Sequence, residues 1–175
     1  MNYRKRKVLM VIPNLMGGGA ERQFILNYEN IDKNRFDIHV CLFNAEGQFL
    51  SFLGKNPVIN LNKKSRFDYL KLVQRLSVVI REMKPDVLYS RLHYANVISS
   101  MALNRSFIDK KVIHIINEET ILSMGLSRSI TGSIAKWLVK KHYQDATKIV
   151  APCLASKEDL IHKFSINDDK ITVIY

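Results

Sequence analysis

The chain has 175 residues, of which 47% are hydrophobic and 25% charged, and its formal net charge is +11. This length supports one hydrophobic core, and the composition excludes a disordered chain. Two distant cysteines in apolar runs exclude a disulfide framework and favour a cytoplasmic compartment, and no apolar run is long enough to span a membrane.

Apolar, β-rich runs alternate with segments of helical period along the chain. We expect strands at residues 7–13, 37–43, 58–61, 86–90, 111–116, 148–151 and 170–175, and helices at 20–31, 67–83, 94–104, 129–143 and 156–164. Several strands are continuously apolar, which is typical of strands buried on both faces of a parallel sheet. The alternation predicts an α/β fold, a Rossmann-like doubly wound and mostly parallel sheet of about seven strands with helices on both faces.

Positive charge gathers in residues 4–7, 63–84 and 128–141. Such uneven placement is expected where an anionic partner meets particular faces of a protein, although positive charge can also serve only solubility. The sequence has no nucleic-acid-binding motif and the basic segments lack interleaved aromatics, so we expect no nucleic-acid partner.

Two expected helices carry much of this basic charge. Within residues 67–83, five apolar side chains at helical spacing predict the face toward the core: Leu70, Val73, Leu76, Ile80 and Met83. Within residues 129–143, Trp137 stands beside Lys136, Lys140 and Lys141, a combination typical of helices that lie on an anionic membrane surface. Such a surface is therefore an expected partner, with ordinary core packing as the alternative for the first helix.

Three of the seven glycines stand together, Gly17, Gly18 and Gly19, between the first expected strand and the first expected helix. Glycine lets the backbone adopt positive φ and approach a ligand closely, and the free N–H groups at a helix start favour anions and polar oxygens. The spacing matches neither the dinucleotide-binding pattern nor the phosphate loop of nucleoside triphosphatases. The triplet therefore predicts a binding loop, with a tight turn that needs only flexibility as the alternative.

The stretch KVLMVIPNLMGGGAERQFILN, residues 7–27, resembles the amino-terminal segment of the retaining glycosyltransferase family 4, which has the GT-B fold. The resemblance continues through RFDIHVCLF, KPDVLYSRLHYANVISSMAL, KVIHIINEE and the segment from Ala146 onward, so it covers nearly the whole chain from Lys7. It implies two Rossmann-like halves that face each other across a cleft. The first half receives the acceptor, and the second holds the nucleotide sugar, which is a co-substrate rather than a cofactor.

This resemblance implies that residues 1–6 form a basic tail and residues 7–175 the acceptor-side domain. The partner domain is then the enzyme's own C-terminal donor-binding domain, which carries the family's Glu-x7-Glu motif. The implied reaction moves a sugar, with retention, to a glycan or lipid-linked acceptor in surface polysaccharide or glycoconjugate synthesis. We expect it in the cytoplasm or at the inner face of the membrane, and we expect no activity from these residues alone.

By the same resemblance, the amides of Gly17 to Gly19 approach the donor diphosphate or the acceptor as the cleft closes. Glu21 and Arg22 match the acidic and basic pair of the family's block. Glu21 can alternatively complement the helix dipole, and Arg22 can be a surface charge or contact an acidic acceptor.

Polar and aromatic residues follow the strand at 86–90, namely Arg91, His93, Tyr94 and Asn96. They can hydrogen-bond sugar hydroxyls and stack on a sugar ring. Alternatively, His93 and Asn96 cap or flank a helix start.

Asn117, Glu118 and Glu119 follow the strand at 111–116. Many relatives have a histidine near this point, close to the transferring sugar, and this chain does not. We expect Asn117 to bind substrate and Glu118 to be the catalytic candidate, because a carboxylate can bind or deprotonate the acceptor hydroxyl if it reaches it directly or through one water. Glu119 is expected to be solvated.

Two other functions stay open from the sequence. The chain can be a stand-alone basic module that binds an anionic membrane or nucleic acid, or part of another GT-B-like enzyme such as a sugar-nucleotide epimerase. No Cys and His cluster has the spacing of a metal site, so we expect no metal.

Overall fold

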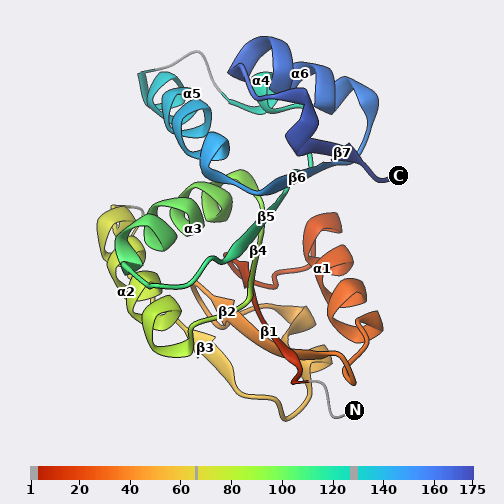
Figure 1. The fold of residues 1–175 in the computed structure, drawn as a ribbon, viewed down its shortest axis with the longest axis vertical. Coiled ribbons are helices and arrows are strands. Elements are labelled where there is room, and N and C mark those ends of the chain that lie inside the picture. The colour runs from red at the N-terminus through yellow and green to blue at the C-terminus, as the bar shows by residue number, and fades with distance from the viewer. Residues whose placement is uncertain (1–3, 66, 127–129) are drawn as a thin grey trace.

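The computed structural model describes residues 4–65, 67–126 and 130–175, and their strands form one parallel sheet in the order β3-β2-β1-β4-β5-β6-β7 (Figure 1). The strands are β1 (Arg6–Ile12), β2 (Phe36–Leu42), β3 (Val58–Asn60), β4 (Val87–Arg91), β5 (Ile113–Asn117), β6 (Lys148–Ala151) and β7 (Ile171–Val173). The predicted fold class and all seven strands are confirmed, with most boundaries moved by one or two residues. Arg6, assigned to the basic tail, begins β1 and pairs with Phe36.

The α-helices are α1 (Gly19–Asn30), α2 (Tyr69–Met83), α3 (His93–Ser106), α4 (Leu122–Gly125), α5 (Ile130–His142) and α6 (Leu154–Phe164). Short 3-10 helices are η1 (Gln48–Leu53), η2 (Tyr143–Asp145) and η3 (Asp168–Lys170). The five expected helices are confirmed, although the expected start at residue 129 lies outside the described residues. The helices η1 and α4 were not predicted from the sequence.

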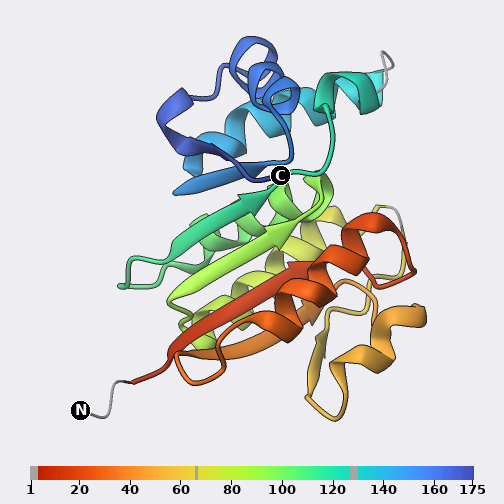
Figure 2. The ribbon, with the colours of Figure 1, turned by 90° about the vertical axis from the view of Figure 1, so that its right-hand side faces the viewer.

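The strand β1 divides the core into two layers because its side chains alternate between the faces of the sheet. Val8, Met10 and Ile12 pack with α1 and η1 on one face, whereas Leu9 and Val11 pack with α2 and α3 on the other. The views of the ribbon show α1 on one side of the sheet, where η1 also packs, and α2, α3 and α5 on the opposite side (Figures 1 and 2).

The α1 side of the later strands is more open. His114 and Ile116 of β5 are buried on the side of α3 and α5, while Ile113 is 37% exposed. Ile115 lies opposite Tyr89 in the parallel register and is half-buried. Parallel sheets normally bury both faces, so this strip of β5 and β6 is a partly uncovered apolar surface beside α1.

The apolar face expected for α2 is confirmed except at Leu70, since Val73, Leu76 and Ile80 are buried and Met83 packs against the same core. Leu72, Leu76 and Ile80 are buried, but Leu70 is 72% exposed. At about 100° per residue, Leu70 lies about 100° around the helix from the centre of the buried stripe. Its three-residue spacing to Val73 was therefore misleading.

Candidate functional site

A groove of about 610 Å³ runs from the carboxyl ends of β4 and β5 down the sheet beside α1. Its polar lining comes from Gln23, Asn27, Tyr89, Arg91, Asn117, Glu118 and Glu119, and its remaining lining from Gly19, Ile115, Val150, Pro152, Ile174 and Tyr175. Arg91 and Asn117 are register partners on the α1 side of the sheet, which explains why residues distant in sequence meet here.

The glycine-rich loop lies at the carboxyl end of β1, as predicted. Gly17 has φ +123°, Gly18 caps α1 in extended conformation, and Gly19 is the first helical residue and lines the groove. A Cβ atom at Gly17 would lie 1.9 Å from Nε2 of Gln48, whereas one at Gly19 would meet nothing within 4 Å. Gly17 is thus required by its backbone conformation, and Gly19 leaves the groove open.

Gly47, which was not singled out from the sequence, lies against the glycine-rich loop and helps to hold it in place. Gly47 has φ +118°, and an added Cβ would lie 2.1 Å from the carbonyl of Leu15. Around it, Leu15 N donates to Glu46 O at 3.0 Å and Phe49 N donates to Leu15 O at 3.1 Å. An isolated glycine after the second strand was the available signal, because close backbone approach is a usual reason for one.

Glu21 and Arg22 lie on α1 outside the groove lining. The carboxylate of Glu21 folds back beside Gly18, where an added Cβ would lie 2.5 Å from Oε2. Arg22 is exposed. The groove side of α1 is formed instead by Gln23 and Asn27, four residues apart on one face of the helix.

Arg91 ends β4 beside a residue in an unusual conformation. Leu92 has φ +72° and ψ 135°, a region that is costly for a residue with a Cβ atom and is characteristic of functional sites. Arg91 is 4% exposed, its Nη1 donates to the hydroxyl oxygen of Tyr89 at 3.0 Å, and its Nε lies 2.5 Å from Oε1 of Glu119. The guanidinium is therefore held inside the site rather than extended into solvent.

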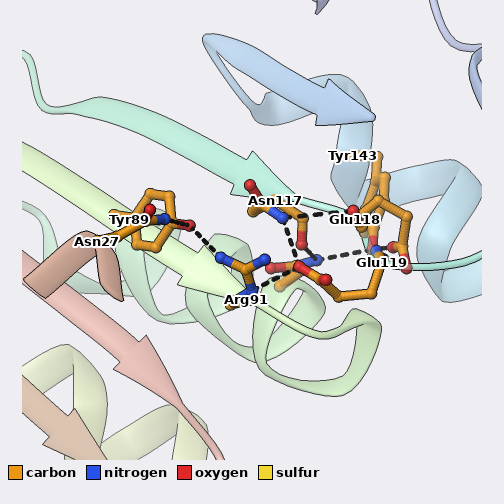
Figure 3. Close-up of polar contacts among 8 residues, drawn as sticks. Asn27, Tyr89, Arg91, Asn117, Glu118, Glu119 and Tyr143 are labelled. Atoms are coloured by element: carbon orange, nitrogen blue, oxygen red, sulfur yellow. Dashed lines mark hydrogen bonds and ion pairs between the residues drawn. The ribbon is translucent and has the colours of Figure 1, made fainter. Parts of the chain in front are cut away.

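The polar contacts form one continuous chain across the groove (Figure 3). Asn27 donates to Tyr89 at 3.1 Å, and Asn117 Nδ2 donates to Oε1 of Glu119 at 2.5 Å. Burial raises the pKa of Tyr89, with Arg91 opposing that effect. The expectation that Glu119 is solvated is wrong, because its side chain is 17% exposed and ion-paired to Arg91.

Glu118 is enclosed on the other side of the strand end. It is 1% exposed, Tyr143 donates its hydroxyl proton to Oε2 at 2.6 Å, and Glu119 N donates to Oε1 at 3.0 Å. Burial raises the pKa of Glu118 to about 7, although these hydrogen bonds lower it. These contacts hold the carboxylate against protein groups, and the catalytic role expected for Glu118 stays a prediction.

Asn96 lies beneath the rim and is fully buried, so it does not contact a ligand in this conformation. Its Nδ2 donates to the hydroxyl of Tyr143 at 3.0 Å and to the backbone oxygen of Asn117 at 3.1 Å. It therefore supports the end of β5, which differs from the expected contact with a sugar hydroxyl. Tyr143, which the sequence analysis did not single out, joins it to Glu118.

Tyr94 and His93 start α3 but do not line the groove. The Tyr94 ring packs edge-on against Phe43 with centroids 5.5 Å apart and tilts against Tyr69 at 5.7 Å. Lys63 Nζ lies 5.1 Å from its centroid, so protein groups occupy the ring surroundings expected for a sugar. His93 is half-buried, and burial lowers its pKa.

Two properties of the described residues bear on metal binding and on a membrane-spanning role. Among them, no three His, Cys, Asp or Glu side chains converge as a metal site would require. None of their helices combines the length and apolar character needed to cross a bilayer. Cys41 and Cys153 are both free thiols.

A doubly wound parallel sheet with a polar groove at the carboxyl ends of its strands defines an α/β ligand-binding domain. Residues 17–175 match the model of Glycosyltransferase Family 4. The chain therefore belongs to glycosyltransferase family 4, as the glycine-rich block indicated.

A relative from Campylobacter jejuni, the N-acetylgalactosamine-N,N'-diacetylbacillosaminyl-diphospho-undecaprenol 4-alpha-N-acetylgalactosaminyltransferase, is 27% identical over 184 residues. That alignment covers 97% of this chain and 47% of the relative, so the chain spans about half the length of the curated relative it matches.

The fold is shared with solved structures of low sequence identity. HepE of Anabaena in complex with UDP-glucose has a TM-score of 0.73 at 24% identity, covering 97% of this chain and 43% of that one. The UDP-GlcNAc 2-epimerase of Methanocaldococcus jannaschii has a TM-score of 0.67 at 16% identity, covering 96% and 45%. Likeness at this identity establishes the fold and does not separate transferase from epimerase.

Proposed function

We propose that the complete protein transfers a sugar from a nucleotide-sugar donor to a hydroxyl of a glycan or lipid-linked acceptor. The residues of this chain would form the acceptor-side half of the enzyme. The observation that carries the proposal is a partly apolar groove, rimmed by hydrogen-bonding groups, at the carboxyl ends of the strands of a family 4 domain. The stand-alone basic module is not favoured, because the match to the family extends over residues 17–175.

In the proposed reaction, the bond between the anomeric carbon of the donor sugar and its phosphate oxygen breaks. A bond from the acceptor oxygen to that carbon forms, the nucleoside diphosphate leaves, and the acceptor proton passes to a base or to the departing phosphate. Closing a cleft around these groups excludes water, which would otherwise take the place of the acceptor.

The lining of the groove suggests roles for Asn117, Glu118 and Glu119 that differ from those expected from the sequence. Glu119 and Asn117 would hydrogen-bond the acceptor, because both line the groove. Glu118 would position Glu119, whose backbone N–H it binds at 3.0 Å. Gly17 to Gly19 would bring backbone amides to the donor diphosphate, since helix starts favour anions.

The second half of the enzyme would close the site. The partly uncovered apolar strip, with Ile113 37% exposed, and the nearby Ile174, 59% exposed, would provide a surface for the part of the protein outside this chain. The match of this chain to about half of its relative supports such a partner. We therefore propose that the 175 residues by themselves transfer no sugar.

The proposed contact with an anionic membrane surface is supported by exposed residues of α5. Ile134 and Trp137 are 53% and 58% exposed, and Lys141 Nζ lies 5.0 Å from the centroid of the Trp137 ring. Lys140 is exposed beside them, whereas Lys136 is half-buried. Exposed aromatic and basic groups on one helical face suit an anionic leaflet.

The function is tested with the complete protein, nucleotide-sugar donors that carry labelled sugars, and lipid extracts as acceptors. We expect label to appear in a lipid or glycan product only when acceptor and donor are both present. Conversion of the donor sugar to its epimer without acceptor would instead support the epimerase and overturn the proposal.

The membrane contact is tested by flotation with vesicles rich in phosphatidylglycerol and with neutral vesicles. We expect binding to the anionic vesicles that weakens with salt and is lost when Trp137 becomes Ala and Lys140 and Lys141 become Glu. The matched control replaces the exposed Lys55 and Lys111 by Glu. Equal loss in the control would show a net-charge effect and overturn the assignment to α5.

A further inference from the structure

The charge of the groove differs from that of the whole chain. The chain carries +11, yet among the described residues that line the groove Arg91 is the sole Lys or Arg side chain. Glu118 and Glu119 also contribute to the lining. The groove is therefore neutral or negative inside a strongly positive protein.

The guanidinium of Arg91 already contacts other protein side chains. Arg91 is 4% exposed, and its Nε and Nη1 are held by Glu119 and Tyr89 at 2.5 and 3.0 Å. Oε1 of Glu119 additionally accepts the bond from Asn117, while Oε2 of Glu119 and Nη2 of Arg91 form no hydrogen bond within the described ranges. An unpaired arginine would bind a carboxylate or phosphate through two parallel hydrogen bonds, but here the Glu119 carboxylate already balances the charge of Arg91 through one ion-pair contact at Nε.

We infer that the groove accepts an uncharged sugar residue and rejects an acidic one, and that Glu119 is the specificity-determining residue. The inference rests on the proposed function and names the acceptor class of the same site. Hydroxyl groups can donate to Oε2 of Glu119 and accept from Gln23 or Arg91 Nη2, whereas both amide hydrogens of Asn117 are already donated to Glu118 O and Glu119 Oε1. A sugar carboxylate in the same place would meet the Glu119 carboxylate, which already balances the charge of Arg91, so the groove has no excess positive charge to offset the like-charge repulsion that disfavours binding.

The experiment compares two probes that differ only at carbon 6, methyl galactopyranoside and methyl galacturonopyranoside. Their binding to the complete protein is measured by saturation-transfer NMR and competition titration. We expect the wild-type protein to prefer the neutral probe by about tenfold or more, which corresponds to about 1.4 kcal/mol. Equal binding, tighter binding of the acid, or no binding of either probe would overturn the inference.

Glu119→Gln should release Arg91 and raise the affinity for the galacturonoside at least about tenfold, because charge-assisted hydrogen bonds to arginine are strong. Glu158→Gln, an exposed substitution on α6 with the same change in charge, should leave the preference unchanged. The double variant Arg91→Gln with Glu119→Gln should lose the gained affinity. If the double variant kept the higher affinity for the galacturonoside, the assigned role of Arg91 would be refuted. If the variants fail to fold, the preference of the wild-type protein between the two probes still tests the inference.

Sugar transfer is measured separately from probe binding. A protein that transfers sugar but does not discriminate between the probes would refute this inference and leave the proposed function standing. A protein that discriminates but transfers no sugar to any acceptor would refute the proposed function instead.

Discussion

Two buried titratable groups, one near the start of β5 and one just after its end, should give opposite pH dependences of stability. Burial raises the pKa of Glu118 from 4.5 to about 7 and lowers that of His114 from 6.5 to about 4. Between pH 4.5 and 7, folded Glu118 keeps a proton that the unfolded chain releases, so its contribution is full below pH 4.5 and is lost as pH rises through 7. Between pH 6.5 and 4, the unfolded chain gains a proton that folded His114 excludes, so stability is lost as pH falls.

The two contributions nearly cancel in the wild-type chain. Each pKa difference corresponds to about 3 kcal/mol, at about 1.4 kcal/mol per pH unit. Glu118→Gln removes the pH dependence of the free energy of unfolding that comes from Glu118. The free energy of unfolding of this variant relative to wild type should therefore rise by about 3 kcal/mol between pH 4.5 and 7. His114→Gln should show the opposite trend, falling by about 3 kcal/mol between pH 4 and 6.5 relative to wild type.

The assay is urea unfolding followed by far-UV circular dichroism at a series of pH values between 4 and 7.5. Differences from wild type remove the contributions of His93 and His142, whose pKa values burial also lowers. Glu158→Gln, on an exposed site, is the control and should show a flat difference. A difference profile for Glu118→Gln that stays flat within about 0.5 kcal/mol would refute the reasoning, since it would mean that folding does not perturb this carboxyl.

The remaining predictions concern the loop and the support of β5. Gly17→Ala and Gly47→Ala should each lower the free energy of unfolding by at least about 1 kcal/mol, because both residues have positive φ. The loss should be larger for Gly47→Ala, because its added Cβ would clash with backbone atoms of Leu15 rather than with a side chain. Gly19→Ala should fold normally in the same urea assay; equal losses at all three sites would contradict this. Tyr143→Phe should cost about 1–3 kcal/mol by leaving buried partners unsatisfied. It should also raise the pKa of Glu118 further, which NMR titration of a labelled carboxyl would detect; an unchanged value would contradict the hydrogen bond.

Most of the sheet could be predicted from the sequence because its strands are apolar runs bounded by proline and polar residues. β6 was placed without error at residues 148–151, and the other strands differ at their ends, where backbone pairing rather than side-chain type decides. The helix η1 was missed because six residues give too little periodicity, and the short α4 for the same reason. Leu70 shows the limit of spacing arguments, since it is apolar yet 72% exposed.

The location of the groove could be predicted from the sequence, but the contacts within it could not. The carboxyl ends of parallel strands meet at one edge, so Arg91 and Asn117 could be assigned to the same rim. Two facts were invisible in the sequence: Tyr143, far along the chain, reaches Glu118, and Phe43 and Tyr69 pack around Tyr94. Such contacts depend on how helices pack on the sheet, which local patterns do not specify.

The sequence did contain the information that separates Glu118 from Glu119. Side chains alternate along a strand, so Asn117 and Glu119 share one phase, while Glu118 shares the phase of Ile116 and of the buried His114. Hydrophobicity alone could not reveal which phase faces the groove, because Ile113, Ile115 and Ile116 are all apolar. Once α1 is known to leave its side of β5 open, the alternation assigns Glu119 to the groove and Glu118 to the covered side. The same alternation explains the chemistry, since the covered carboxylate needs the Tyr143 hydroxyl and the open one pairs with Arg91.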